Sequence, residues 1–190
     1  MMSKGEQTRA RVLQTTLDLM ERQGFHNTGL QQIIKESGTP KGSLYFHFPE
    51  GKDQIAALAL AQGAAIIQGL IEQAFAASRS PRQAMDMVVK GLTVRLVESD
   101  FCKGCPVATV ALEIGDQHPL VKQACEAAYS HWLTVIANGL KAFGMSAAKA
   151  RKEATLLLSG LEGALILAKV QRDTAPLKQV ADAMMERLSE

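Results

Sequence analysis

The chain has 190 residues and a formal net charge of +2 at neutral pH. That length is sufficient to bury a substantial core, and the near-balanced charge excludes a polycation that binds any nucleic acid by charge alone. The three cysteines are an odd number, which favours a reducing compartment over a disulfide framework. Residues 1–6 have no secretory or transit pattern, so we expect a cytoplasmic protein.

Two helices are predicted before residue 40. Apolar residues three and four positions apart predict a first amphipathic helix that ends near Gly24, and these residues are Ala10, Leu13, Leu17 and Met20. Leu30, Ile33 and Ile34 lie on one face of a short second helix, which Thr28 is expected to open and cap. Gly38 can adopt the left-handed conformation that stops it.

Residues 38–47 predict the turn and second helix of a helix-turn-helix. Thr39 can cap this helix through its hydroxyl, and Pro40 stands where a first-turn proline is tolerated. The helix itself is expected from Lys41 to His47. Gly42 costs about 1 kcal/mol of helix stability relative to alanine, which makes sense if the backbone must approach a phosphate strand. A unit of this kind places one short helix in the DNA major groove.

The run from Thr28 to Lys52 resembles the helix-turn-helix of the TetR family of bacterial repressors. The matching segments are Gly24-Phe25, Thr28, Gly38, Lys41-Gly42-Ser43-Leu44-Tyr45, His47-Phe48-Pro49 and Lys52. The chain departs from the family at Gln31, where an arginine is often found, and at Glu50-Gly51, which lengthens the spacing to Lys52 by one residue. That extra residue, together with Gly104-Cys105-Pro106-Val107, is similar to the LmrA/YxaF subgroup.

The resemblance implies a homodimer that binds a palindromic, double-stranded DNA operator. The residues expected to contact phosphates or bases are Thr28, Lys41, Gly42, Ser43, Tyr45, His47 and Lys52. Lys41 is the candidate for a base-edge contact, since lysine can donate to O6 and N7 of guanine. The resemblance also implies repression, because a bound dimer can occlude a promoter.

A long helix from Lys52 to about Ala77 follows, and Gln54 to Ile71 contains no charged residue. The run can be interpreted as a membrane span or as a buried helix. We favour the buried helix and no membrane partner, because the run contains glutamines and has more alanine than leucine. Residues 1–50 are expected to form the DNA-binding domain and residues 51–190 the effector-binding and dimerisation domain. The long helix would connect them mechanically.

Further helices are predicted over 82–99, 107–114, 118–143 and 147–173, with a last one from Pro176. The apolar run 107–114 could be a strand by propensity, but no partner strand is predicted, so we expect a helix. Ser146 can cap the helix from 147. The predicted fold class is all-α, with about nine helices.

The last two helices indicate self-association, because small side chains let another helix approach closely. The predicted dimer contacts are Ser159, Gly160, Gly163, Leu167, Val180 and Met184. In the alternative interpretation these faces pack only within one chain. The family resemblance and the two-fold symmetry of operator binding favour the dimer.

The middle helices are rich in methionine and alanine, which suits either a packed core or an adaptable pocket. The candidate ligand-binding residues are Phe75, Met85, Phe101, Tyr129, His131 and Trp132. Each of them taken singly fits a core position; the resemblance favours a pocket for a small, largely apolar effector. Glu162 stands among leucines and glycines as either an exposed residue or a buried carboxylate, and the sequence leaves both open.

The motif Cys102-Lys103-Gly104-Cys105 has three interpretations: a metal site, a redox switch, or two unpaired thiols. A structural zinc site needs four ligands, and the remaining donors, Cys125, His118 and His131, have no standard spacing. We therefore expect no metal site and no cofactor. No nucleophile motif accompanies the four histidines, which argues against an enzyme.

The resemblance, added to these patterns, implies a ligand-responsive transcriptional repressor. One alternative is a repressor that senses oxidation or a metal through Cys102 and Cys105. Another is a DNA-binding scaffold with a solid C-terminal core and no effector.

Overall fold

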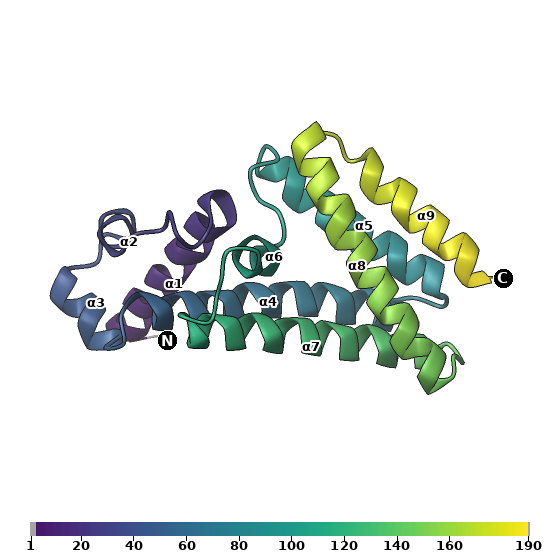
Figure 1. The fold of residues 1–190 in the computed structure, drawn as a ribbon, viewed down its shortest axis with the longest axis horizontal. Helices are drawn as coiled ribbons and strands as arrows, with labels where there is room; N and C mark the ends of the chain where they lie inside the picture. The colour runs from purple at the N-terminus through teal and green to yellow at the C-terminus, as the bar shows by residue number, and fades with distance from the viewer. Residues whose placement is uncertain (1–2, 190) are drawn as a thin grey trace. The chain divides into compact units, whose positions relative to one another are not determined.

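The computed structural model describes residues 3–189, and over these residues the chain forms nine helices (Figure 1). They are α1 (Lys4–Gln23), α2 (Leu30–Ser37), α3 (Lys41–His47), α4 (Lys52–Ala77), α5 (Pro81–Glu98), α6 (Pro106–Ala111), α7 (Pro119–Ala142), α8 (Ala147–Gln171) and α9 (Ala175–Ser189). The all-α prediction is confirmed. The apolar run after residue 106 is helical, as expected from the lack of a predicted partner strand.

Backbone contacts divide the described residues into two compact units. Unit 1 comprises residues 3–64 and 106–128, and unit 2 comprises residues 65–105 and 129–189. This division differs from the boundary expected near residue 50, because α4 continues without a linker and its first half is part of the unit 1 core. Ile55 and Leu60 in that half are fully buried. The two halves of α4 and of α7 thus belong to different units.

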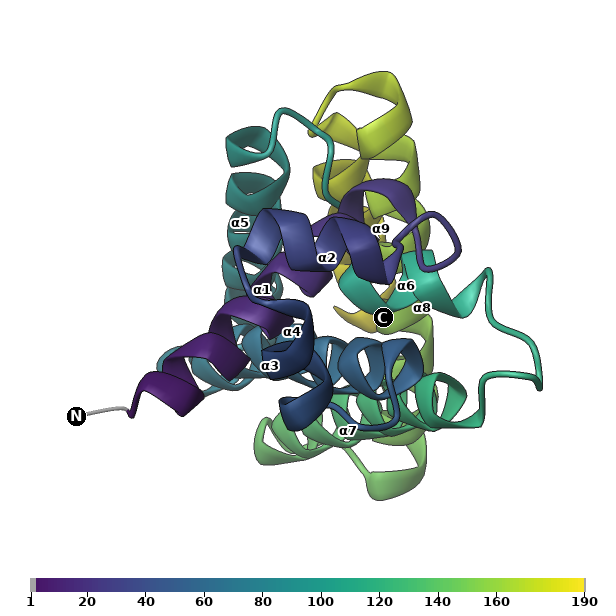
Figure 2. The ribbon, with the colours of Figure 1, turned by 90° about the vertical axis from the view of Figure 1, so that its left-hand side faces the viewer.

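In unit 1, α1 packs against α2, α3 and α6 (Figures 1 and 2). Its start is fixed by a capping box: the Glu6 backbone N–H donates to the Ser3 hydroxyl at 3.2 Å, and the Ser3 N–H donates to the Glu6 carboxylate at 2.7 Å. Phe25, Leu44 and Phe48 are fully buried in this unit. The core therefore holds both ends of the helix-turn-helix segment.

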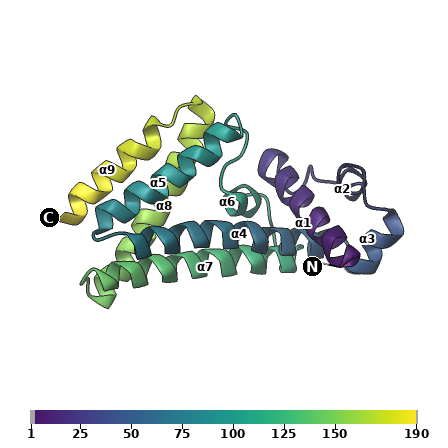
Figure 3. The same cartoon turned by 180° about the vertical axis from the view of Figure 1, so that it is seen from behind.

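In unit 2, α9 lies beside α8 and also packs against α5 (Figures 1 and 3). The buried Glu153 carboxylate of α8 pairs with the Arg187 guanidinium of α9. Ser146 caps α8 by accepting from the Lys149 N–H, as predicted. Trp132 of α7 and Leu177 of α9 are buried and belong to the apolar core of this unit.

α4 is long and apolar enough to cross a membrane by length and composition alone, and 44% of its most apolar window is buried within the protein. Two of its polar side chains have partners in the protein. The Gln62 amide donates to Gln14 at 3.2 Å, and the Gln68 amide donates to Glu72 at 2.8 Å. These pairings fit a core helix with one side exposed to solvent, so we retain that interpretation of α4 over a membrane span.

Candidate functional site

Gly38 sets the turn between α2 and α3. It lies in the left-handed region at φ 60°, and its N–H donates to the carbonyls of Ile34 and Lys35. The N–H of Thr39 also donates to the Ile34 carbonyl at 3.2 Å. A residue with a Cβ would be strained in this conformation. The structure thus gives Gly38 the helix-stopping role predicted for it.

The two predicted threonine caps are wrong. The N-cap of α2 is Gly29, and the Thr28 hydroxyl instead donates to the Gly24 carbonyl at 2.7 Å, with only 1% of the residue exposed. Thr28 therefore closes the turn after α1, with its side chain buried within unit 1. The N-cap of α3 is Pro40, and the Thr39 hydroxyl is buried with no hydrogen-bond partner among the described residues.

α3 is anchored by one buried side chain and presents the others outward. Leu44 is fully buried, whereas the predicted DNA contacts are exposed or half-buried. Those residues are Lys41, Gly42, Ser43, Tyr45 and His47. A Cβ built at Gly42 would meet nothing within 4 Å, so packing within the protein does not require glycine there. This fits a helix whose backbone must approach an outside surface.

Phe46 is a candidate that sequence reasoning missed. It is 82% exposed, an unusual position for a phenylalanine, while Phe48 two residues later is fully buried. Helical periodicity could have separated them, because Leu44 and Phe48 are four residues apart on the inner face and Phe46 falls opposite. Arg9 of α1 lies 5.6 Å from the centre of the Phe48 ring and helps to hold the end of α3.

Lys52 is engaged within unit 1. Its ammonium group lies 4.1 Å from the centre of the Phe25 ring. Burial lowers the pKa of Lys52, and the charges of Asp53 and Glu113 oppose that shift. The observed contact of Lys52 with Phe25 supports a role in fixing the start of α4. It supports a contact with DNA phosphate less directly.

Two histidines of unit 1 tie the segment between α6 and α7 to other parts of that unit: His118 to the start of α4, and His26 to the turn after α1. His118 Nδ1 is 2.9 Å from the Asp53 carboxylate. The His26 backbone N–H donates to the Glu113 carboxylate at 2.9 Å, and His26 Nε2 lies 3.1 Å from the Glu113 carbonyl. No spacing in the sequence indicates this cluster, since its members are up to 92 positions apart.

Unit 2 contains an apolar pocket between its parts of α4, α5, α7 and α8. Three predicted ligand residues, Phe75, Met85 and Trp132, line it. The other three do not: His131 is exposed, Tyr129 packs edge-on against Trp132, and Phe101 lies in the loop after α5. Further walls come from aliphatic side chains that include Ile67, Leu92, Ile136, Leu140, Leu161 and Leu165.

Glu162 of α8 is the ionisable side chain of this pocket. It lies in the wall, and its carboxylate accepts a hydrogen bond from the Cys105 thiol. Its Oε2 atom is buried with no hydrogen-bond partner among the described residues. Burial raises the pKa of Glu162, while the Cys105 hydrogen bond acts in the opposite direction. The structure lies between the two interpretations left open by the sequence, because the residue is half-buried while its Oε2 atom is shielded from solvent.

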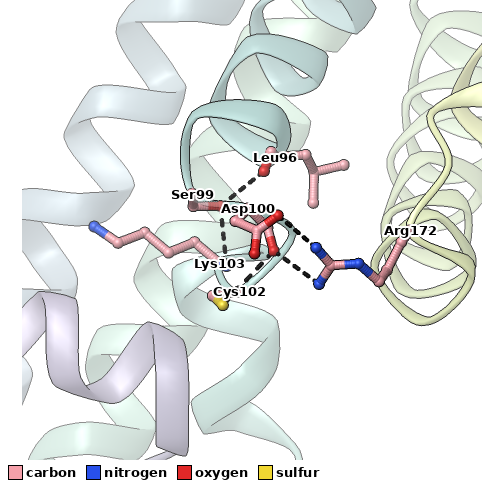
Figure 4. A network of polar contacts seen from close by, with 6 residues as sticks. All are labelled: Leu96, Ser99, Asp100, Cys102, Lys103 and Arg172. Carbon is pink, nitrogen blue, oxygen red and sulfur yellow. Dashed lines mark hydrogen bonds and ion pairs between the residues drawn. The ribbon is translucent and has the colours of Figure 1, made fainter.

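The loop after α5 is held by Arg172, the left-handed residue that ends α8 (Figure 4). Asp100 and Phe101 have φ angles of 53° and 58°. Arg172 donates to the Asp100 carbonyl at 3.2 Å, pairs with its carboxylate, and lies over the Phe101 ring. The Ser99 hydroxyl donates to the Leu96 carbonyl and accepts from the Lys103 N–H. Phe101, in contact with Arg172, is not among the residues that line the pocket.

The cysteines are free and differ in environment. Cys102 is exposed, whereas Cys105 and Cys125 are 8% and 6% exposed. Within residues 3–189 no group of three or more His, Cys, Asp or Glu side chains is arranged to hold a metal ion. The geometry of the loop and pocket therefore lends the metal interpretation no support.

The predicted dimer residues fall into two groups. A methyl group built at Gly160 would overlap Met184 and approach Val180 to 3.2 Å, so these three residues form the contact of α8 with α9 inside the chain. Ser159, Gly163 and Leu167 instead face outward. They continue an exposed apolar stripe along α8 that includes Leu156, Ile166 and Val170, which are 47%, 51% and 78% exposed.

The chain matches two protein-family models and is similar along most of its length to known bacterial regulators. Residues 12–59 match the family model "Bacterial regulatory proteins, tetR family", and residues 81–183 match "Transcriptional regulator LmrA/YxaF-like, C-terminal domain". The chain is 32% identical to the HTH-type transcriptional regulator LmrA of Bacillus subtilis, over 98% of this chain and 99% of LmrA. It is 34% identical to the uncharacterized HTH-type transcriptional regulator YxaF of the same organism, over 96% and 95%.

Solved structures agree on the fold. The regulatory protein TetR from Rhodobacter sphaeroides superposes with a TM-score of 0.83 at 22% identity, covering 96% of this chain and 97% of that one. A TetR-family transcriptional regulator from Agrobacterium tumefaciens gives a TM-score of 0.84 at 18% identity, covering 97% and 98%.

Proposed function

Because the chain belongs to the TetR family of bacterial transcriptional regulators, we propose that it represses transcription as a homodimer on a palindromic operator and is released by a small, largely apolar effector. Family membership makes it a helix-turn-helix regulator and not an enzyme. Repression, operator symmetry and the class of effector are the proposal. A soluble bacterial regulator of this kind would act in the cytoplasm, where its operator lies.

The exposed side of α3 is the observation that carries the DNA-binding part. Leu44 and Phe48 fix the helix from beneath, so the residues between them have a defined direction. Lys41 would donate to a guanine edge, and Phe46 would contact a thymine methyl group. Tyr45 and Ser43 would donate to phosphates, which positions the helix without reading sequence.

The outward stripe of α8 supports the dimer. Contiguous exposed apolar side chains along one helix face are typical of a protein contact site, and Gly163 within the stripe would let a second helix approach. A two-fold axis would present two copies of α3 to half-sites separated by whole turns of the duplex, about 34–36 Å each. His47, half-buried at the end of α3, would contact the backbone at the edge of each half-site.

The pocket of unit 2 supports the effector. α4 and α7 each contribute residues to both units, so a change of side-chain packing around the pocket can be passed along either helix. The effector would release DNA only by as much as its affinity differs between the DNA-bound and free arrangements. It would therefore have to fit better in the arrangement that binds DNA worse.

The test is footprinting on the DNA that flanks the protein's own gene, followed by titration of the protected site with Tyr45→Ala. We expect the substitution to weaken operator binding by about 1–3 kcal/mol and to leave the thermal midpoint nearly unchanged, because Tyr45 is 42% exposed. Tyr45→Phe, which keeps the ring, serves as the control for the hydroxyl. Operator affinity that Tyr45→Ala leaves intact would contradict the proposed docking of α3.

A further inference from the structure

Glu162 is a carboxyl group in a place where a carboxyl group is costly. The side chains that surround it in the pocket wall are aliphatic or aromatic apart from the Cys105 thiol. That thiol occupies one hydrogen-bonding position of the carboxylate. The Oε2 atom is shielded from solvent and has no partner among the described residues. Buried polar atoms in native proteins are nearly always hydrogen-bonded, so an unpaired one calls for an explanation.

We propose that Glu162 is the anchor for a protonated amine, and that the effector is a lipophilic ammonium compound whose N–H group donates to Glu162 Oε2. The inference rests on the proposed role of the pocket as the effector site. It adds the chemical class of the ligand and the residue that selects it.

The lining favours a cationic donor over other ligands. An anion would meet the Glu162 carboxylate with no cationic side chain in the pocket wall to offset it. A hydrocarbon would exclude water and still leave Oε2 unpaired. An ammonium group satisfies that oxygen with a charge-assisted hydrogen bond, which is stronger than a neutral one, and its alkyl body occupies the apolar remainder of the pocket.

Cys105 and the pocket walls fit this arrangement. The thiol holds one side of the carboxylate and so directs the free oxygen toward the ligand. Met85 of α5, which also lines the pocket, is an unbranched, adaptable side chain, and leucines make up much of the rest. Such walls adjust to chain-like ligands more readily than to a single rigid shape.

The experiment measures ligand binding without DNA. Full-length protein is titrated with hexylamine, 1-hexanol and hexanoate by calorimetry, and occupancy is followed by the emission of Trp132, the only tryptophan in the chain and a residue of the pocket wall. We expect hexylamine to bind about ten- to a hundredfold more tightly than 1-hexanol, the difference between a charged and a neutral hydrogen bond. Hexanoate should be the weakest ligand.

Glu162→Gln should remove most of the preference for hexylamine, again about ten- to a hundredfold, and change 1-hexanol binding little. Glu153→Gln is the matched control, because it neutralises another buried glutamate of α8 that pairs with Arg187 outside the pocket. Thermal unfolding shows whether both variants are folded, and Glu162→Met repeats the test if Glu162→Gln is not.

Three results would overturn the assignment: equal affinity for hexylamine and 1-hexanol, no loss of hexylamine affinity in the Glu162 variants, or no hexylamine binding up to its solubility limit. Because no DNA is present, any of these leaves operator binding standing. Conversely, a chain that binds hexylamine but no operator would refute the proposed repression alone.

Discussion

The α3 surface and the unit 2 pocket place their functional groups in opposite environments. On α3, a large aromatic side chain, Phe46, is 82% exposed to water. In the pocket, a carboxyl oxygen of Glu162 is sealed among apolar side chains. Both placements cost free energy in an isolated chain, because phenylalanine side chains are normally buried and carboxylates are normally exposed to water. Both positions therefore point to a partner that the isolated chain lacks.

The two regions also differ in how the chain builds them. The α3 surface comes from one short segment between Gly38 and Phe48. The pocket is assembled from four helices and a loop, with members from Ile67 to Leu165. A surface built locally tolerates changes elsewhere in the chain, whereas a pocket built from distant segments depends on the packing of every helix that lines it.

The sharpest test of the α3 surface replaces each of its two phenylalanines, Phe46 and Phe48, with alanine and compares the two variants. Phe48→Ala should destabilise the protein by about 3–5 kcal/mol, because it empties a fully buried site. Phe46→Ala should leave the free energy of unfolding nearly unchanged and weaken operator binding by about 1–3 kcal/mol at thymine-containing positions. Denaturant unfolding and operator titration measure the two effects. A stability loss in Phe46→Ala as large as that in Phe48→Ala would remove Phe46 from the DNA-contact surface.

A slightly smaller effect, on dimer formation, is expected from a substitution in the exposed apolar stripe of α8. Gly163→Leu fills open space in the monomer, but it should overpack a subunit contact by about 1–3 kcal/mol, twice per dimer because of two-fold symmetry. Sedimentation velocity should show more monomer than in the wild type. Gly69→Leu on α4, which also meets nothing within 4 Å, controls for adding a leucine to a helix. If Gly163→Leu remains as dimeric as Gly69→Leu, the dimer contact lies elsewhere.

The helix-turn-helix could be predicted from sequence because its determinants are local. Gly38 stops α2 through its own backbone conformation, and the apolar residues Ile33 in α2 and Leu44 in α3 mark the face of each helix that is buried. The Thr28 cap was predicted wrongly because a hydroxyl can donate as well as accept. Thr28 donates backward to the Gly24 carbonyl instead of accepting from a backbone N–H of α2, and one residue of register decides between the two.

The pocket could be predicted only in part, since its lining depends on tertiary packing. Phe75, Met85 and Trp132 were identified from composition and prove to line it. Phe101 was not separable from them by residue type, because its position is set by left-handed backbone at Asp100 and by the contact with Arg172, seventy-one residues later in the chain. The environment of Glu162 likewise depends on Cys105, which no helical spacing relates to it.

The cost of burying Glu162 gives a third prediction, in the pH dependence of stability. Burial raises the pKa of Glu162 in the folded protein above that of the unfolded chain. The folded state therefore keeps its proton to a higher pH, and stability is lost as pH rises through the folded pKa. Glu162→Met should be more stable than the wild type by about 1–2 kcal/mol at neutral pH. The gain should shrink as pH falls through the raised folded pKa and be lost by pH 4.5, the ordinary pKa of a glutamate. Chemical denaturation at several pH values measures it; a gain that is constant with pH would mean the carboxyl is not responsible.

Arg172→Ala probes the loop that borders the pocket and should have a smaller effect. The ion pair with Asp100 is exposed and contributes at most about 1 kcal/mol. Its loss should nevertheless loosen the left-handed backbone at Asp100 and Phe101, where non-glycine residues are disfavoured. Hydrogen exchange at residues 99–105 should accelerate, while exchange in α3 stays as it was. Unaltered exchange in the loop would show that Ser99 and the backbone suffice to hold it.

The smallest effect on the protein itself is expected from alkylation of its thiols. Iodoacetamide at pH 8 should modify Cys102, which is exposed, far faster than Cys105 or Cys125. Burial and the charge of Glu126 raise the pKa of Cys125 to about 11, so little of the reactive thiolate forms there. Mass spectrometry of peptides gives the three rates.

Operator binding and hexylamine binding should survive modification of Cys102, because that side chain belongs neither to α3 nor to the pocket wall. Cys102→Ser provides the unreactive control. If alkylation or peroxide treatment instead abolished operator binding in the wild type and not in Cys102→Ser, the thiol would be a sensor in its own right. The chain would then respond to oxidation at an exposed group, and the contrast between an outward reading surface and a buried sensing pocket would no longer describe it.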